Sequence, residues 1–428
     1  MRTPTDPWIA SRLGISWEEL SAETLLGYQM QRFRETVRYA AGHSPFYAER
    51  LAGIDADSIR TAGDIRRLGV TSEQDLAGNE NRFLCIPPGS VERIFSVPTT
   101  GTHGKRKRVF FTRNDLAPSV EFYYHAFLTF IRPGDRLLVM MGGSSEGSVG
   151  DTIDRSLSSI GVITRVFGQV TDLETAWKAV LDFAPDVIVG IPYQVAALAA
   201  WSRAHGLPRG VRCVLLSADD VLDAIRERIS RLWGAEVYSH YGLTETGLAG
   251  GVDCCAHQGY HLRACDLYTE ILDPDDDGFG ELAVTTFGRE AMPLIRYRTG
   301  DIARISTQPC PCGGVLPRLE MIRGRLSNSC VIFGQRLFLS RIEEIVFSDD
   351  AAVDLECTVG EDSLDLLVRT LPGEEVDKKA MWDRLTDDVL PAGTKTVIAE
   401  ETVCAFRPER SPKKRMRVRK GKENGVSQ

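Results

Sequence analysis

The sequence is poor in cysteine and lacks a long apolar run. Ten cysteines in 428 residues are far fewer than a disulfide-stabilised secreted scaffold carries. The longest uncharged apolar stretch, residues 187–202, contains Pro192 and Gln194 and is shorter than the ~20 residues that span a bilayer. No apolar segment with a small-residue cleavage site follows Met1. We therefore expect a cytoplasmic protein without a membrane partner.

Charge is unevenly distributed along the chain. Lysine and arginine total 51 against 59 aspartate and glutamate, a formal net charge of −8. Residues 407–422 hold nine basic residues and the single acid Glu409, so this segment carries +8 and the remainder −16. A zinc-containing nucleic-acid-binding protein is one hypothesis for such a segment. It is disfavoured because Phe406 is the single aromatic nearby and the acidic remainder would repel a phosphate backbone.

Hydrophobic periodicity predicts an α/β protein. Helical spacing dominates residues 1–85, and short β-rich runs alternate with amphipathic helical runs over residues 90–300, which favours βα units and a largely parallel sheet. At roughly 100–200 residues per domain, the length allows two or three domains. We expect a large N-terminal domain over residues 1–325 and a small, mobile α+β domain over 326–428. The clearest elements are strands at 136–141, 187–191 and 211–216, helices at 173–183 and 221–232, and a hairpin joining 268–272 to 281–286.

A glycine-rich basic loop lies between two β-like runs. Residues 99–107 read TTGTHGKRK, where glycines allow close backbone approach to an anion, threonine hydroxyls donate to phosphate oxygens and Lys105 adds positive charge. The loop is not a Walker A motif, because the G-x-x-x-x-G-K-[ST] spacing is absent. The pattern favours a polyphosphate site, and a solvated basic turn between strands is the alternative.

The order of further motifs resembles one family. The loop at 99–107 is similar to the Ser/Thr/Gly-rich loop of acyl-adenylate-forming (AMP-binding) enzymes. Within that superfamily, the run AMPLIRYRTGDI at 291–302 and the insert CPCG at 310–313 resemble the phenylacetate-CoA ligase branch. The other matching motifs are YGLTETG at 241–247, GELAVT at 280–285, YRTGD at 297–301 and Gly324-Arg325.

This resemblance implies roles for a nucleotide site. Such an enzyme joins a carboxylate to ATP, so the site must neutralise the phosphates and hold the reacting oxygens in line. Glu245 would be a catalytic residue that holds Mg²⁺, and Asp301 would accept hydrogen bonds from the ribose hydroxyls. A helix-start position for Glu245 and a turn cap for Asp301 are the alternatives. The remaining implied nucleotide-binding residues are Thr99, Thr100, Gly101, Thr102, Gly104, Lys105, Ser217, Ala218, Asp219, Tyr241, Gly242, Thr244 and Arg325.

The acyl-substrate pocket is less distinct in the sequence. A glycine-rich segment, residues 142–150, follows a strand-like run at the place where the family has a pocket segment. An aromatic carboxylic acid is what the resemblance implies, whereas ordinary core packing is the alternative for aromatic residues here. The candidate lining residues are Tyr123, Tyr124, Gly142, Gly143, Ile191 and His240.

Cysteines and histidines gather in two short stretches. Four thiolate or imidazole ligands are enough for a tetrahedral structural zinc site. Cys255 and His257 compete as ligands in the sequence, and free buried cysteines with a surface histidine are the alternative. The set that resembles metal-bearing members of the branch is Cys254, His261, Cys310 and Cys312.

The basic C-terminal segment resembles the family's lysine-bearing end. There a lysine enters the adenylation site, and Lys414 is the catalytic candidate, with Lys413 as its neighbour. Lys413 stands where the family usually has glycine, and residues 327–328 at the hinge are not acidic as is usual. The implied acceptor is coenzyme A, while a carrier-protein thiol, an amine and an inactive nucleotide-binding homologue stay open. The oligomeric state is open too, a homodimer included.

Overall fold

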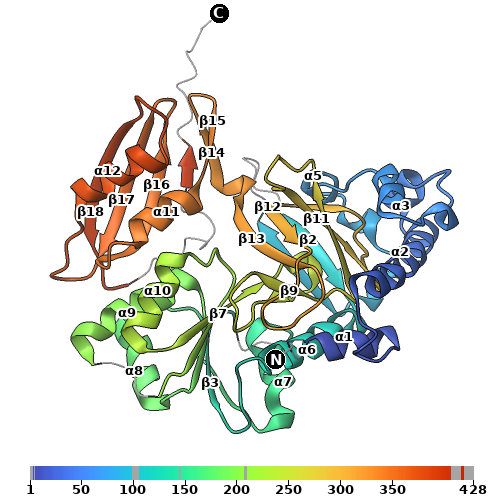
Figure 1. The fold of residues 1–428 in the computed structure, drawn as a ribbon, viewed down its shortest axis with the longest axis horizontal. Coiled ribbons are helices and arrows are strands. Elements are labelled where there is room, and N and C mark those ends of the chain that lie inside the picture. The colour runs from blue at the N-terminus through green and yellow to red at the C-terminus, as the bar shows by residue number, and fades with distance from the viewer. Residues whose placement is uncertain are drawn as a thin grey trace, which may run out of the picture. The chain divides into compact units, whose positions relative to one another are not determined.

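A computed structural model describes residues 3, 5–98, 106–143, 146–206, 210–405 and 416–418 (Figure 1). The chain separates into two compact units, each built from three segments. Unit 1 comprises residues 1–132, 145–160 and 240–322, and unit 2 comprises residues 133–144, 161–239 and 323–428. The expected division into 1–325 and 326–428 stays a prediction, although the last segment of unit 2 begins close to that boundary.

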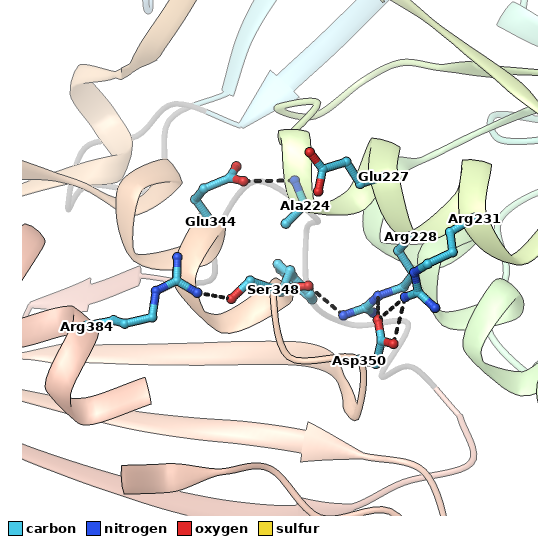
Figure 2. Close-up of a pocket in the computed structure, with 9 residues that line it drawn as sticks. Ala224, Glu227, Arg228, Arg231, Glu344, Ser348, Asp350 and Arg384 are labelled. Atoms are coloured by element: carbon cyan, nitrogen blue, oxygen red, sulfur yellow. Dashed lines mark hydrogen bonds and ion pairs between the residues drawn. The ribbon is translucent and has the colours of Figure 1, made fainter. Parts of the chain in front are cut away.

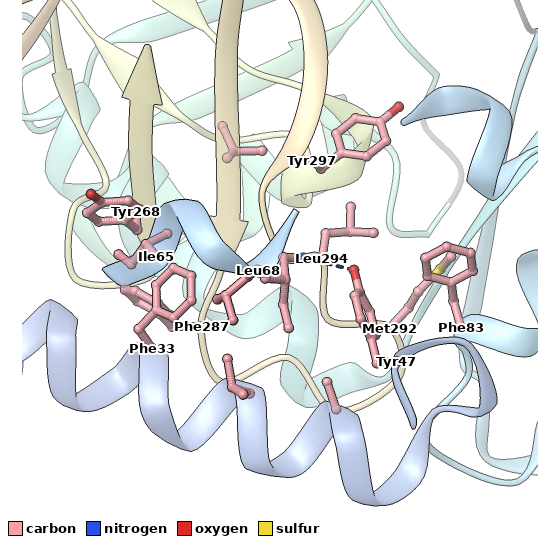
Figure 3. Close-up of a cluster of buried hydrophobic side chains, with 14 of the residues drawn as sticks. Phe33, Tyr47, Ile65, Leu68, Phe83, Tyr268, Phe287, Met292, Leu294 and Tyr297 are labelled. Atoms are coloured by element: carbon pink, nitrogen blue, oxygen red, sulfur yellow. Dashed lines mark hydrogen bonds between the residues drawn. The ribbon is translucent and has the colours of Figure 1, made fainter. Parts of the chain in front are cut away.

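Unit 1 begins with a layer of helices that cover a large core. In α2 (Ala22–His43) the side chain of Ser21 accepts a hydrogen bond from the Thr24 amide, and this capping box starts the helix. Phe33 is fully buried on its inner face and packs edge-on against Tyr268 and Phe287 (Figure 3). The other helices are α1 (Thr5–Leu13), α3 (Pro45–Arg50), α4 (Ala62–Ile65), α5 (Glu73–Leu76), α6 (Arg113–Phe127) and α7 (Val149–Leu157).

Two sheets complete unit 1. β1 (Arg93–Pro98) and β2 (Arg106–Phe111) pair antiparallel. In the larger sheet β10 (Leu267–Leu272) pairs antiparallel with β11 (Gly280–Thr286), which confirms the predicted hairpin. The order continues through β12 (Tyr297–Ser306), β13 (Arg318–Arg325), β9 (Tyr260–Leu262) and β8 (Gly251–Val252).

Unit 2 contains the predicted parallel sheet. Its order is β4-β3-β5-β6-β7, and every neighbouring pair is parallel. α8 covers residues 173–183 as predicted, because the Asp172 side chain caps its first turn and Ala184 ends it in the left-handed conformation. The elements are β3 (Arg136–Met140), β4 (Ile163–Val166), α8 (Leu173–Phe183), β5 (Val187–Gly190), α9 (Pro192–His205), β6 (Cys213–Leu216), α10 (Asp223–Trp233) and β7 (Glu236–Tyr241).

The last segment of unit 2 is a small α+β layer with its own core. Leu355 of its sheet is buried with Ile342 and Leu385 from the two helices, so the predicted α+β character of this end is confirmed (Figure 1). The sheet order is β18-β17-β16-β19. The elements are β14 (Ser329–Ile332), β15 (Gln335–Phe338), α11 (Leu339–Phe347), β16 (Ala352–Val359), β17 (Ser363–Thr370), α12 (Lys378–Asp388), β18 (Lys395–Thr402) and β19 (Met416–Val418).

Helices α10 and α11 contact each other through charged side chains near their ends (Figure 2). Glu344 of α11 accepts hydrogen bonds from the amides of Asp223 and Ala224 at the start of α10, at 3.1 and 2.8 Å. Arg228 of α10 is fully buried and donates to three carbonyl oxygens at and beyond the end of α11, at 2.6–2.7 Å. Each helix therefore supplies a charged side chain to the opposite-signed end of the other.

Within the part of the chain that the structure describes, none of the helices combines the length and the apolar character that crossing a bilayer would need.

Candidate active site and metal centre

Two residues predicted for the nucleotide site contact each other in unit 1. Tyr241 ends β7, and its hydroxyl donates to Asp301 Oδ2 at 2.8 Å across the sheet. Asp301 lies in β12 and is buried, and its amide donates to the Thr299 hydroxyl at 3.1 Å. Residues 60 positions apart in the sequence thus place an aromatic ring beside a buried carboxylate. A carboxylate in this setting suits two neighbouring hydroxyl groups of a ligand.

Glu245 is held by a buried lysine that the sequence analysis did not select. Lys107 of β2 forms an ion pair with Glu245 Oε1, and both side chains are at most 5% exposed. Lys107 Nζ also donates to the Tyr297 hydroxyl at 3.0 Å, and that hydroxyl donates to Glu245 Oε1 at 3.1 Å. Glu73 adds a second carboxylate 3.3 Å from Nζ. The arrangement fixes the Glu245 carboxylate and neutralises its charge in a site closed to water.

The turn that carries Glu245 needs glycine at its start. A Cβ at Gly242 would lie 2.0 Å from the Leu248 carbonyl oxygen and 2.7 Å from His240 Cε1, so no other residue fits without a shift. Thr244 begins the 3₁₀ turn at residues 244–246 and is half-buried. Glycine at position 242 therefore allows the backbone of residue 248 to pack directly against residue 242.

Two of the predicted pocket residues lie together beneath this turn. The rings of Tyr123 in α6 and His240 in β7 have centroids 5.3 Å apart, and both side chains are buried. Burial lowers the pKa of His240 to about 3, with Arg263 adding to the effect, so the imidazole is neutral at pH 7. Tyr124 is half-buried and its ring contacts His125 edge-on rather than the other candidates.

The remaining predicted residues of unit 2 follow its parallel strands. Gly142 and Gly143 come after β3, Ile191 after β5, and Ser217, Ala218 and Asp219 after β6. Because these strands are parallel neighbours, the residues share one edge of the sheet, where ligands of open α/β sheets bind. The Ser217 amide donates to the Gly190 carbonyl at 3.0 Å, and Ala218 takes a left-handed φ of 73°. Arg325 is half-buried at the end of β13.

The structure gathers the four predicted metal ligands of unit 1. One ligand atom from each of Cys254, His261, Cys310 and Cys312 lies within 4.8 Å of the others, and all four residues are buried. The Cys254 and Cys310 sulfurs are 3.6 Å apart, and Cys312 Sγ lies 3.5 Å from His261 Nε2. A tetrahedral zinc ion with bonds of about 2.0–2.3 Å places neighbouring ligand atoms roughly 3.3–3.8 Å apart.

The competing ligands lie outside this group. Cys255 is exposed, and the imidazole Nδ1 of His257 is 3.1 Å from an Asp253 carboxylate oxygen. The Gly314 amide points at Cys312 Sγ at 3.4 Å, an N–H···S contact that stabilises a metal-bound thiolate. Burial lowers the pKa of His261 to about 4, which keeps the ring neutral as a ligand must be. The donor set, spacing and surroundings fit Zn²⁺.

Several predicted residues lie outside the described residues. They are the loop residues Thr99, Thr100, Gly101, Thr102, Gly104 and Lys105, together with Lys413 and Lys414. Their roles stay predictions. Lys107, the last residue of the segment 99–107, could have been recognised in the sequence as a buried charge. It precedes Val109 and Phe111 at two-residue spacing, so its side chain lies on the same buried, apolar face of the strand.

Comparisons with known proteins agree with this geometry. Residues 87–285 match the family model described as AMP-binding enzyme. The chain is 29% identical over 348 residues to the phenylacetate-coenzyme A ligase of Thermus thermophilus, covering 77% of each protein. It is also 29% identical to the ligase of the same name from Escherichia coli K12, covering 76% of this chain and 77% of that one.

The fold has a close counterpart among solved structures. A 2-hydroxyisobutyryl-CoA ligase, crystallised in the postadenylation state, superimposes with a TM-score of 0.76 at 18% identity and covers 94% of this chain and 90% of its own. This likeness shows that the predicted α/β fold is the fold of this 2-hydroxyisobutyryl-CoA ligase. The matched family model and the ligases of similar sequence show that the chain is similar to AMP-binding enzymes, and among them to phenylacetate-coenzyme A ligases.

Proposed function

We propose that this enzyme activates a carboxylic acid with ATP and passes the acyl group to coenzyme A. In the first step a carboxylate oxygen attacks the α-phosphorus of ATP, the bond to the β-phosphate bridging oxygen breaks, and acyl-AMP and pyrophosphate form. In the second step the thiol sulfur attacks the acyl carbon, AMP leaves with the bonding electrons, and the thiol proton passes to solvent. The match to AMP-binding enzymes and the similarity to coenzyme A ligases support both steps.

The contact between Tyr241 and Asp301 is the observation that carries the proposal. It joins two separate family motifs into one small site in which a buried carboxylate faces a tyrosine ring. In our proposal Asp301 binds the ribose hydroxyls, and Tyr241 flanks the adenine while its own hydroxyl fixes the carboxylate. Ser217, Ala218, Asp219 and Arg325 are proposed as further nucleotide-binding residues.

Glu245 is proposed to bind the Mg²⁺ ion that neutralises the phosphates. A carboxylate oxygen is the kind of ligand that Mg²⁺ prefers, and Thr244 beside it offers a hydroxyl. Mg²⁺ held by Glu245 would neutralise charge on the phosphate oxygens during pyrophosphate release. Lys107 and Tyr297 orient Glu245 Oε1, so that the carboxylate need not reorganise as the reaction proceeds.

An aromatic acid is the proposed substrate class. The packed rings of Tyr123 and His240 offer an apolar wall, and the neutral imidazole brings no cation that would hold a second carboxylate. The similarity to phenylacetate-coenzyme A ligases points to the same class. Gly142, Gly143, Ile191 and Tyr124 are proposed as further residues of the acyl-substrate pocket.

The basic C-terminal segment and the phosphate loop are proposed to contact the anionic groups of the reaction. Lys414 is proposed to contact the carboxylate and the α-phosphate during adenylation, with residues 326–428 acting as a mobile domain. The excess positive charge of residues 407–422 suits an acceptor that carries phosphates, as coenzyme A does. The phosphate loop at residues 99–105 is proposed to grip the β- and γ-phosphates.

Zn²⁺ is proposed as a structural ion bound by Cys254, His261, Cys310 and Cys312. The ligands join the start of β9 to the turn between β12 and β13, and four protein ligands leave no open position for chemistry. Elemental analysis of the purified protein should find about one zinc per chain, and the Cys312→Ser variant should lose it. A zinc content near zero in protein purified without chelators would contradict the site.

Pyrophosphate release across a panel of acids tests the whole proposal. Each acid is run with and without coenzyme A, and aryl acids should release pyrophosphate while thioester forms when coenzyme A is present. Release without thioester would move the acceptor to a carrier protein or an amine. No acid-dependent release by protein with bound ATP would leave the chain as a nucleotide-binding homologue and refute the proposed activity.

Two substitutions test the assigned residues. Asp301→Ala should weaken ATP binding measured by calorimetry by about tenfold, because one charge-assisted contact of about 1.4 kcal/mol is lost. Lys414→Ala should slow pyrophosphate release far more than it weakens ATP binding, whereas Lys413→Ala should retain most of the activity. An equal loss in both lysine variants would contradict the choice of Lys414.

A further inference from the structure

The backbone of the Glu245 turn is bound by side chains at four consecutive carbonyl groups. The carbonyls of residues 245, 246, 247 and 248 accept hydrogen bonds from Arg289, Arg263, Ser119 and Tyr123 respectively. The two central contacts are short, at 2.8 and 2.7 Å, and the outer two are 3.4 Å. All four donors are buried.

Arg263 is the centre of this set. Its Nη2 donates to the Thr246 carbonyl at 2.8 Å, and its Nη1 donates to the Ser119 hydroxyl at 2.8 Å. That hydroxyl in turn donates to the Gly247 carbonyl at 2.7 Å, so one guanidinium fixes two adjacent carbonyls, the second through a relay. Asp266 lies 3.6 Å from Arg263 Nε and balances its charge. The guanidinium is almost completely buried.

The turn has a conformation that needs such support. Gly247 and Leu248 both lie in the left-handed region, with φ of 81° and 74°. A leucine in this region costs roughly 1–2 kcal/mol, so it persists where the surroundings determine it. Arg289 packs over the Phe111 ring at 4.4 Å and reaches Gly247 closely enough that a Cβ there would lie 3.3 Å from its Nη2.

The two arginines donate to backbone carbonyls of the turn, whereas other side chains bind the Glu245 carboxylate. That carboxylate is bound by Lys107 and Tyr297, as described above. The turn is therefore fixed by two sets of contacts, one to the side chain of Glu245 and one to the backbone carbonyls of residues 245–248.

We propose that Arg263, acting with Ser119 and Arg289, is a positioning residue that fixes the backbone of residues 245–248 and so sets the place of the Glu245 carboxylate for the reacting phosphates. The inference rests on the proposed function of Glu245. It assigns Arg263 no contact with substrate or nucleotide. An active-site group displaced by even 1 Å can lower the rate about a hundredfold, which is why the support of this turn matters to catalysis.

The test combines local hydrogen exchange with steady-state kinetics of the full-length enzyme. Arg263→Met removes both contacts, and Arg263→Lys retains the charge but has one nitrogen in place of the two that donate. Arg34→Met is the matched control, since Arg34 also donates to a backbone carbonyl of unit 1, that of Ile59, at 3.0 Å. Exchange is followed by mass spectrometry in a peptide that spans residues 243–249, without ligands.

Arg263→Met should exchange at least tenfold faster in this peptide, while peptides from β11 and α2 keep the wild-type rate. Its kcat for pyrophosphate release should fall at least tenfold, with the KM for the acid changed less than twofold, because substrate contacts are intact. Arg263→Lys should recover part of kcat, and Arg34→Met should match wild type. If Arg263→Met does not fold, Ser119→Ala removes the relay alone and should give the same pattern with a smaller change.

Three results separate the possible failures. Equal acceleration of exchange throughout unit 1 would make Arg263 a general stability residue and overturn the inference. A loosened turn with unchanged kcat would also overturn it. Wild-type enzyme that releases no pyrophosphate with any acid would refute the proposed function instead, and the exchange data would still decide whether Arg263 fixes the turn.

Discussion

Removing Lys107 should destabilise unit 1 by an amount that its surroundings allow us to work out. In Lys107→Met the Glu245 carboxylate stays buried, at 5% side-chain exposure, and loses its main counter-charge. Truncating one partner of a buried ion pair costs about 3–5 kcal/mol, because the other charge is left without compensation. Tyr297 still donates to Glu245, and Glu73 is partly exposed and can regain water. We therefore expect a loss near the lower limit, about 3 kcal/mol.

A double-mutant cycle separates this charge effect from lost packing. Glu245→Gln removes the orphaned charge, so the double variant Lys107→Met/Glu245→Gln should recover about 2 kcal/mol relative to Lys107→Met alone. Urea unfolding without nucleotide or metal provides the free energies. The matched control is Lys178→Met, because Lys178 pairs with Glu174 on the exposed face of α8 and should change stability by less than about 0.5 kcal/mol.

Either of two results would refute the reasoning. A loss below about 1 kcal/mol for Lys107→Met would mean that Glu245 reaches water or another cation in the folded protein. A double variant that is as unstable as the sum of the single variants would mean that the two charges do not interact.

Three further predictions concern other buried groups. Gly242→Ala should reduce pyrophosphate release at least a hundredfold, because its Cβ would lie 2.0 Å from the Leu248 carbonyl oxygen, whereas Gly27→Ala in α2 meets no atom within 4 Å and should be neutral or stabilising. Because burial lowers the pKa of His240 to about 3, its contribution to stability is complete above pH 6.5 and falls by about 1.4 kcal/mol per pH unit towards pH 3. His240→Gln should flatten that part of the curve of unfolding free energy against pH. Arg228→Met should destabilise unit 2 by about 3 kcal/mol in urea unfolding, because three carbonyls lose their donor, and a loss below about 1 kcal/mol would show that water replaces it.

The periodic parts of the fold were predictable from the sequence. The helix at residues 173–183 and the hairpin of β10 and β11 agree closely with expectation, since each has a strong hydrophobic period and a capping or turn signal at its ends. The gathering of the four candidate metal ligands was predictable for a different reason. Cysteine and histidine are scarce in this sequence, so two clusters of them indicate a possible metal site. In the structure Cys254 lies in the group of four, whereas its neighbour Cys255 is exposed.

The support of the candidate site was not predictable in the same way. Arg263 meets Ser119 and Thr246 from 144 and 17 residues away, and no local period indicates which of many arginines makes such contacts. Of the two lysines near the glycine-rich loop, the motif favoured Lys105, so Lys107 received no predicted role. The discontinuous units have a similar cause, because residues 133–144 join unit 2 through strand pairing with segments that follow much later.

The contacts between the ends of α10 and α11 have a consequence for truncation of the chain. A chain cut after residue 322 would keep Arg228 but lose all three carbonyls that it contacts, and it would uncover the guanidinium, because α11 and the residues after it pack against this side chain. It would also leave the first amides of α10 without the carboxylate of Glu344. A shortened protein for binding or crystallisation studies can therefore keep Arg228, which water would reach, but should carry Ser, Asp or Asn at position 222 as a new helix cap.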